Sequence, residues 1–158
     1  GRLHQAVDEN FNSQGRPAWA GLKLGSQLSR AGALTKRGQV SQARFDKYVR
    51  NHKILQKTGR LRNSITEASD NDSARVGTNM AYAAIHNFGG QTAAHMIYPR
   101  HKKALAWATG AYPVKNVKHP GSRIPARPFM QITPQDEHEL VETVSDYLAS
   151  VCGLPKGS

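Results

Sequence analysis

The stretch from residue 133 to residue 153 carries the clearest structural signal in the chain. Thr133 is a good N-cap residue, Pro134 suits the first helical position, and Asp136 stands three residues after the cap, as in a capping box. The pattern predicts an amphipathic helix of about 18 residues that ends at Gly153. Because its apolar side needs a cover, we expect this helix to lie on a β-sheet. The apolar residues at helical spacing are Leu140, Val141, Val144, Tyr147, Leu148 and Val151.

The middle of the chain has the pattern of short β-strands. Residues 61–68 and 74–78 flank a cluster of Asp, Asn and Ser at residues 70–73, which predicts a hairpin. Residues 119–128 contain three prolines, which exclude a helix and most ladder pairing and therefore predict an extended loop. Further strands are expected at residues 95–98, 103–108 and 112–118.

Three further helices are expected from apolar residues at helical spacing, over residues 3–11, 43–57 and 80–88. The second should stop at Thr58-Gly59 and the third at Gly89-Gly90. Glycine suits both places because it readily takes the left-handed conformation that a helix C-cap needs.

The order of these elements predicts the α+β class. We expect an antiparallel β-meander packed by helices on one face, a long C-terminal amphipathic helix and extended loops. The length suits a single domain over residues 1–158. Within it, residues 16–42 are rich in small and cationic residues, so we expect a flexible basic loop that Trp19 anchors.

The formal net charge of +11 is unevenly distributed along the chain. Residues 1–62 hold 13 Lys and Arg against three acidic residues, whereas residues 131–158 hold one Lys against five acidic residues. A basic N-terminal part suits a polyanionic neighbour such as DNA. The same asymmetry suits head-to-tail contact between copies, in which the basic part of one copy meets the acidic part of the next. Charge alone leaves both interpretations open.

A dense group of cations lies in and after the predicted second helix, where Tyr48 is the one aromatic residue placed to stack on a base. If DNA is bound there, we expect contact with its backbone and no reading of its sequence. The alternative is that these cations are solvated on helix and loop surfaces. The cations that we expect to face a partner or the DNA path are Lys47, Arg50, Lys53, Arg60, Arg62, Arg123 and Arg127.

The sequence lacks the motifs of most catalytic chemistries. It lacks a nucleophile elbow, paired catalytic carboxylates and a phosphate-binding loop, and its seven histidines do not have zinc-ligand spacing. We therefore predict no catalytic residue, no metal, no cofactor and no enzymatic activity; a small basic enzyme of the ribonuclease type is the remaining enzymatic alternative.

Cys152 is the only cysteine, which excludes an intrachain disulfide. No apolar run reaches the ~18 residues of a membrane-spanning helix, so we expect no membrane contact.

Four short stretches, in this order and spacing, together resemble one family. The chain is similar to the phage virion morphogenesis family of Mu-like phages and prophages, the tail-completion proteins, and more loosely to tail-to-head joining proteins of the phage neck. The stretches are residues 16–19 (RPAW), 54–65 (ILQKTGRLRNSI), 76–90 (VGTN and YAAIHNFGG) and 124–130 (IPARPFM).

The resemblance implies a structural virion protein that completes the tail and joins it to the DNA-filled head. Such proteins commonly form rings, often sixfold, around the DNA path. The implied partners are other copies of this chain in a homo-oligomer such as a hexamer, the tail tube or terminator protein, the head connector protein and the DNA backbone in the ring lumen. The implied location is the neck or tail of the virion, after assembly in the host cytoplasm. The alternative function is a basic, sequence-independent nucleic-acid-binding protein.

Within the matched stretches, most residues have a packing interpretation. Leu61 and Ile65 should share one side of a strand, and Tyr82, Ile85 and Phe88 should pack the short helix. Residues 124–129 should form a stiff extended arm that inserts the Phe129 side chain into the core and fixes the position of the final helix. The residues that we expect to shape the fold are Trp19, Thr58, Gly59, Leu61, Ile65, Tyr82, Ile85, His86, Phe88, Gly89, Gly90, Pro128 and Phe129.

Overall fold

The computed structural model describes residues 1–35, 39–100, 103–105 and 113–153. Its helices are α1 (Arg2–Asn12), α2 (Leu24–Arg30), α3 (Gln42–Asn51), α4 (Arg60–Asn63), α5 (Ala83–Phe88) and α6 (Pro134–Cys152). Its strands are β1 (Ile65–Ser69), β2 (Ala74–Thr78), β3 (Gly90–Gln91), β4 (His95–Ile97), β5 (Val117–His119) and β6 (Arg123–Ile124). The predicted α+β class and the long C-terminal helix are confirmed.

The strands of the described ranges pair antiparallel in three separate two-stranded ladders. The predicted hairpin is confirmed: β1 pairs with β2, and Ile65 lies opposite Thr78. β4 pairs with β5, and β3 pairs with β6. Strand β6 lies within residues 119–128, where only a loop was expected. Arg123 and Ile124 can still pair with β3 because their own N–H groups are intact on the N-terminal side of Pro125.

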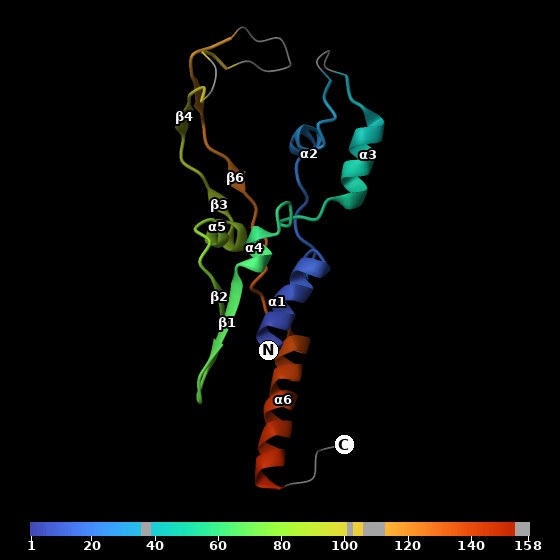
Figure 1. Ribbon diagram of the computed structural model, residues 1–158, viewed down its shortest axis with the longest axis vertical. Coiled ribbons are helices and arrows are strands. Elements are labelled where there is room, and N and C mark those ends of the chain that lie inside the picture. Colours follow the sequence, from blue (N-terminus) through green and yellow to red (C-terminus); the bar gives the residue numbers. More distant parts are fainter. Residues whose placement is uncertain (36–38, 101–102, 106–112, 154–158) are drawn as a thin grey trace.

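The molecule is open and elongated (Figure 1). Helix α6 extends past the other elements at one end, and two arms extend at the other end, one carrying β4 and the other carrying α2 and α3. The accessible surface is 11943 Å², whereas a compact monomer of 17.3 kDa would expose about 7,800 Å². The chain therefore exposes much more surface than a compact monomer of the same mass.

A small aromatic core lies where α1 meets α4, α5 and the arm that precedes α6. The ring of Phe11 lies 5.7 Å from that of Trp19, edge to face, and 5.4 Å from that of Phe129. Segments from the beginning, middle and end of the chain therefore meet in one core, as Trp19 and Phe129 were expected to do. The buried core residues are Val7, Phe11, Trp19, Leu61, Ile65, Ala83 and Phe129.

The predicted helix over residues 43–57 is too long, because α3 ends at Asn51. The backbone N–H of Ile54 donates to Gln14 Oε1 (2.6 Å), and Gln56 Nε2 donates to the carbonyl of Phe11 (2.7 Å). These bonds to the end of α1 hold the segment in turns in place of a helix. Gly59 does have a left-handed φ of 69°, but it precedes α4 and does not end α3.

Two further predictions differ from the structure in their detail. Residues 60–63 form α4, so Leu61 reaches the core from a helical turn and the strand begins only at Ile65. Helix α2 and a bridge between Leu34 and Val40 lie within residues 16–42, which were expected to be a loop throughout. Half of the strand predicted over residues 103–108 lies outside the described residues, although Leu105 pairs with Val114.

Gly89 makes the sharp exit from α5 that the sequence predicts. Its φ of 73° and ψ of 178° fall in a region that only glycine occupies readily. A Cβ atom there would also lie 2.7 Å from the backbone nitrogen of Ala126. We expect Gly89→Ala to lower the free energy of unfolding by about 2–3 kcal/mol, measured by urea denaturation.

Gly32→Ala is the matched control for this prediction. Gly32 also has a positive φ, of 57°, but no atom lies within 4 Å of the position of its added Cβ. Backbone strain alone should therefore cost about 1 kcal/mol. Equal losses for the two variants would show that the contact with Ala126 is unimportant.

Candidate functional site

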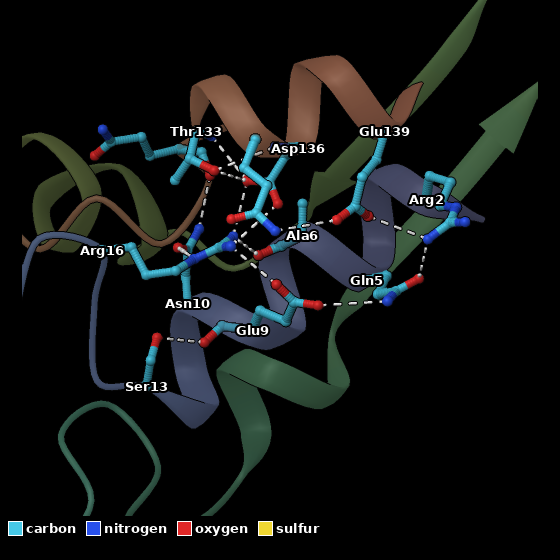
Figure 2. Close-up of polar contacts among 12 residues, drawn as sticks. Arg2, Gln5, Ala6, Glu9, Asn10, Ser13, Arg16, Thr133, Asp136 and Glu139 are labelled. Carbon is cyan, nitrogen blue, oxygen red and sulfur yellow. Dashed lines mark hydrogen bonds and ion pairs between the residues drawn. The ribbon is translucent and has the colours of Figure 1, made fainter. Parts of the chain in front are cut away.

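The guanidinium of Arg16 holds the base of α6 against α1 (Figure 2). Its two terminal nitrogens donate to both carboxylate oxygens of Asp136, at 3.1 and 2.9 Å. The same nitrogens also donate to Glu9 Oε2 (2.9 Å) and to the carbonyl of Ala6 (2.9 Å), and Nε donates to Asn10 Oδ1 (2.9 Å). All five N–H groups of the guanidinium therefore have an acceptor.

Asn10 extends this network to the arm that precedes α6. It is fully buried, and its amide nitrogen donates to the carbonyls of Phe129 (3.0 Å) and Gln131 (2.7 Å). Because its amide oxygen accepts from Arg16, every polar atom of the side chain is bonded. Residues 129–136 are thus fixed to α1 through both the backbone and side chains.

The predicted capping box at the start of α6 is confirmed. Thr133 Oγ1 accepts from the backbone N–H of Asp136, and Asp136 Oδ2 accepts from the backbone N–H of Thr133 (2.8 Å). Burial favours the neutral form of Asp136, but the hydrogen bonds from Thr133 and Arg16 outweigh it and hold the pKa of this carboxyl below its ordinary value. Asp136 is therefore an anion that fixes where α6 begins and in which direction it points.

The prediction that α6 lies on a sheet is wrong. Its first turns pack against α1, where Arg2 also pairs with Glu139 (3.2 Å), and the rest extends away from the body (Figure 1). Periodicity showed that the helix has an apolar side but not whether the subunit covers it. Five apolar side chains, each between 54% and 68% exposed, form what we name the α6 stripe: Val141, Val144, Tyr147, Leu148 and Val151.

The predicted interface cations divide into two groups. Arg62 is half-buried and donates from Nε to Asp8 Oδ1 (2.8 Å), so it holds α4 to α1 and was wrongly expected to be exposed. Arg127 is buried, and its side chain donates to the carbonyls of Ala20 (3.0 Å) and Gly21 (3.4 Å). The cations that are exposed as expected are Lys47, Arg50, Lys53, Arg60 and Arg123.

Arg127 forms part of the wall of a groove between the two arms, which we name the basic groove. The groove has a volume of about 800 Å³ and contains apolar side chains such as Leu55, Tyr82 and Ile124. None of the described residues that line it is acidic. Its cations are Lys23, Arg30, Lys57, Arg123 and Arg127.

Burial and the positive charges of this groove lower the pKa values of His86 and Arg127. Burial lowers the pKa of His86, and the nearby charges of Arg127 and Arg30 lower it further. Burial also lowers the pKa of Arg127, with a smaller contribution from Arg30, although a guanidinium remains protonated. The groove therefore presents uncompensated positive charge beside apolar surface, a combination that suits a negatively charged apolar partner.

The residues expected to shape the fold take different places. Ile85, His86 and Pro128 are half-buried, and Thr58 is exposed in the basic groove. Phe88 was wrongly expected to pack α5, since its side chain is 79% exposed. The helix instead buries Ala83 and Asn87, and Asn87 Oδ1 accepts from the backbone N–H of Met130 (3.1 Å). Tyr82 is also partly exposed, and its ring packs edge to face with the ring of His86.

The described residues contain no group of three or more His, Cys, Asp or Glu side chains that could hold a metal ion. None of the described helices is long and apolar enough to cross a membrane.

Sequence reasoning missed the network of Asn10 and Arg16, because a buried asparagine and a loop arginine have no periodic signal. The buried role of Asp136 was also missed, although its place in the cap was expected.

The model of the phage virion morphogenesis family matches residues 1–149, which include all but the last turn of α6. Over 147 residues the chain is 33% identical to Mu-like prophage FluMu G protein 2 of Haemophilus influenzae. That alignment covers 93% of this chain and 71% of the relative. No solved structure matches the chain.

Proposed function

Since the chain belongs to the phage virion morphogenesis family, we propose that it completes the phage tail and joins it to the DNA-filled head. Membership in the family confirms the resemblance seen in the four short stretches and indicates a role in virion assembly. The proposal adds the place of action, the head–tail joint or neck, and a structural mode of action without catalysis. Its partners would be other copies of this chain, the end of the tail and the head connector.

The observation that carries this proposal is the exposed α6 stripe. Monomeric proteins rarely leave five neighbouring apolar side chains in water, because covering them is favourable by about 25 cal/mol per Å². The network around Arg16 holds this helix in one direction, so the stripe is presented to a neighbour in a fixed geometry. An open subunit with a preset docking helix suits a protein that is built into a larger particle, and we propose an oligomeric ring as its form.

Electron microscopy of an induced lysate from a strain that lacks this gene tests the proposal. We expect DNA-filled heads and separate, unattached tails, because each half is built by other proteins. A plasmid copy of the gene should restore joined particles. Intact, infectious virions in the lysate without the gene would rule out the proposed function.

A specific observation supports contact with DNA as a second activity. Lys47, Arg50 and Lys53 are all exposed on or just after α3, on an arm that extends from the body. We propose that they face the DNA path and bind the phosphate backbone. Changing all three to Glu is expected to lower the plaque titre about tenfold or more, since the reversed charges would repel phosphate.

The control for this prediction is Lys118→Glu, which changes an exposed cation on the other arm. It should leave the titre close to that of the wild type. An unchanged titre for the triple variant would argue against DNA contact at α3. It would leave the structural proposal intact, because that proposal depends on α6.

A further inference from the structure

We propose that the α6 stripe of one copy docks into the basic groove of the next copy, in a head-to-tail contact. The inference deepens the proposed function by naming the surfaces through which copies of this chain would associate. The two surfaces lie at different ends of the subunit, so they cannot meet within one copy (Figure 1). Contact between two different surfaces gives a heterologous interface, which closes into a ring or continues as an open chain.

The shape of the α6 stripe favours a groove over a second helix. Val141, Val144, Leu148 and Val151 follow the three–four spacing of a coiled-coil seam. Tyr147 and the half-buried Leu140 widen this seam to about a third of the helix circumference. A stripe of that width leaves part of its surface in water when it faces one other helix. A groove with apolar walls covers it more completely.

The charges of the two surfaces also match. The groove contains five cations, and no described residue in its lining is acidic. Residues 131–158 hold five acidic residues and one Lys. Glu139, Glu142 and Asp146 lie on the side of α6 opposite the stripe, so they would act through the long-range field and not through direct pairs. The cations of the groove attract an acidic α6 through this field, whereas a second α6 carries the same sign of net charge and offers no such attraction.

The chain has enough uncovered surface for two contacts of this kind. The stripe extends over residues 141–151, which is about 15 Å of helix, and the groove has a volume of about 800 Å³. The accessible surface exceeds that of a compact monomer by about 4,000 Å². Since a standard interface buries about 800 Å² on each partner, a subunit that makes two such contacts would bury about 1,600 Å² of its own surface.

A mixing experiment with two variants tests this contact. The stripe variant, Val144→Asp with Leu148→Asp, keeps an intact groove, and the groove variant, Lys57→Glu with Arg123→Glu, keeps an intact stripe. All four side chains are exposed or line the groove, so both variants should fold. In sedimentation velocity we expect the wild type to form oligomers and each variant alone to stay monomeric. An equal mixture should form a one-to-one dimer and nothing larger, because only one pairing of intact surfaces remains.

Three results would overturn the proposal. They are a wild type that stays monomeric up to its solubility limit, a groove variant that assembles like the wild type, and a mixture that stays monomeric. The second result would indicate that α6 pairs with α6 or with another surface. If one of these is found while the gene deletion still yields detached tails, the contact is wrong and the proposed function stands.

Cysteine cross-linking gives an independent test. Cys152 is exposed and would first be changed to Ser. Val144→Cys on the stripe and Ser122→Cys in the groove should then form disulfide-linked dimers and higher species under mild oxidation. Asp146→Cys, on the opposite side of α6, combined with Ser122→Cys should form few. Equal cross-linking of the two pairs would contradict docking through the stripe.

Discussion

Replacing Val144 and Leu148 with aspartate should abolish virion production while leaving the subunit folded. Both side chains are more than half exposed in the subunit, so their loss should change its free energy of unfolding by only about 0.5 kcal/mol each. Buried in an interface, each side chain would contribute about 1.5–3 kcal/mol to the free energy of association. The loss of both should therefore weaken association by at least about 100-fold. Plaque titre after complementation of the deletion strain, together with thermal unfolding of the purified variant, checks both parts.

The control places the same charges on α6 outside the row of Val144 and Leu148. Thr143 and Ser150 are exposed and lie about 100° or more around the helix from both residues, so Thr143→Asp with Ser150→Asp should leave the plaque titre unchanged. Wild-type titres from the stripe variant would show that this apolar surface has no function in assembly. Low titres from both variants would show that charge on α6, and not its apolar stripe, decides the outcome.

Arg16→Met should lower the free energy of unfolding by about 3–4 kcal/mol, because it leaves the carboxylate of Asp136 buried without its ion pair. The loss should lie in the lower part of the range for buried pairs, since the Arg16 side chain is 24% exposed. It also removes the donor to Asn10. A domain of this size is stable by only about 5–15 kcal/mol, so the variant should unfold at a clearly lower urea concentration.

Arg2→Met is the matched control, since it also breaks an ion pair between α1 and α6. The Arg2–Glu139 pair is exposed on both sides, at 46% and 39%, and exposed pairs contribute less than about 1 kcal/mol. A second variant, Asp136→Asn combined with Arg16→Met, should recover part of the stability by removing the unpaired charge. Equal urea midpoints for Arg2→Met and Arg16→Met would contradict the role assigned to Arg16.

Elements with local signals could be predicted from the sequence. The start of α6 was placed correctly because the reciprocal bonds of Thr133 and Asp136 lie within four residues. The hairpin of β1 and β2 was found from its turn cluster, in which Asp70 Oδ1 accepts from the backbone N–H of Ser73 (2.7 Å). The α+β class followed from the order of such elements.

Features that depend on distant contacts could not be predicted. The end of α3 is set by hydrogen bonds that the segment after it donates to Gln14 Oε1 and to the carbonyl of Phe11, residues about 40 positions earlier in the chain. Nothing in the local pattern separates buried Arg127 from exposed Arg123, since burial depends on where residues 20 and 21 lie. Likewise, the periodicity of α6 defines its apolar side but does not show that the subunit leaves it uncovered.

Analysis of purified virions tests the central claim most directly. Mass spectrometry should detect the protein in particles that have been separated from free subunits. Cryo-electron microscopy should show it as a ring of copies at the joint between head and tail, with α6 of each copy against its neighbour. Absence of the protein from infectious, purified virions would contradict the account, because a structural component of the joint must remain in the particle.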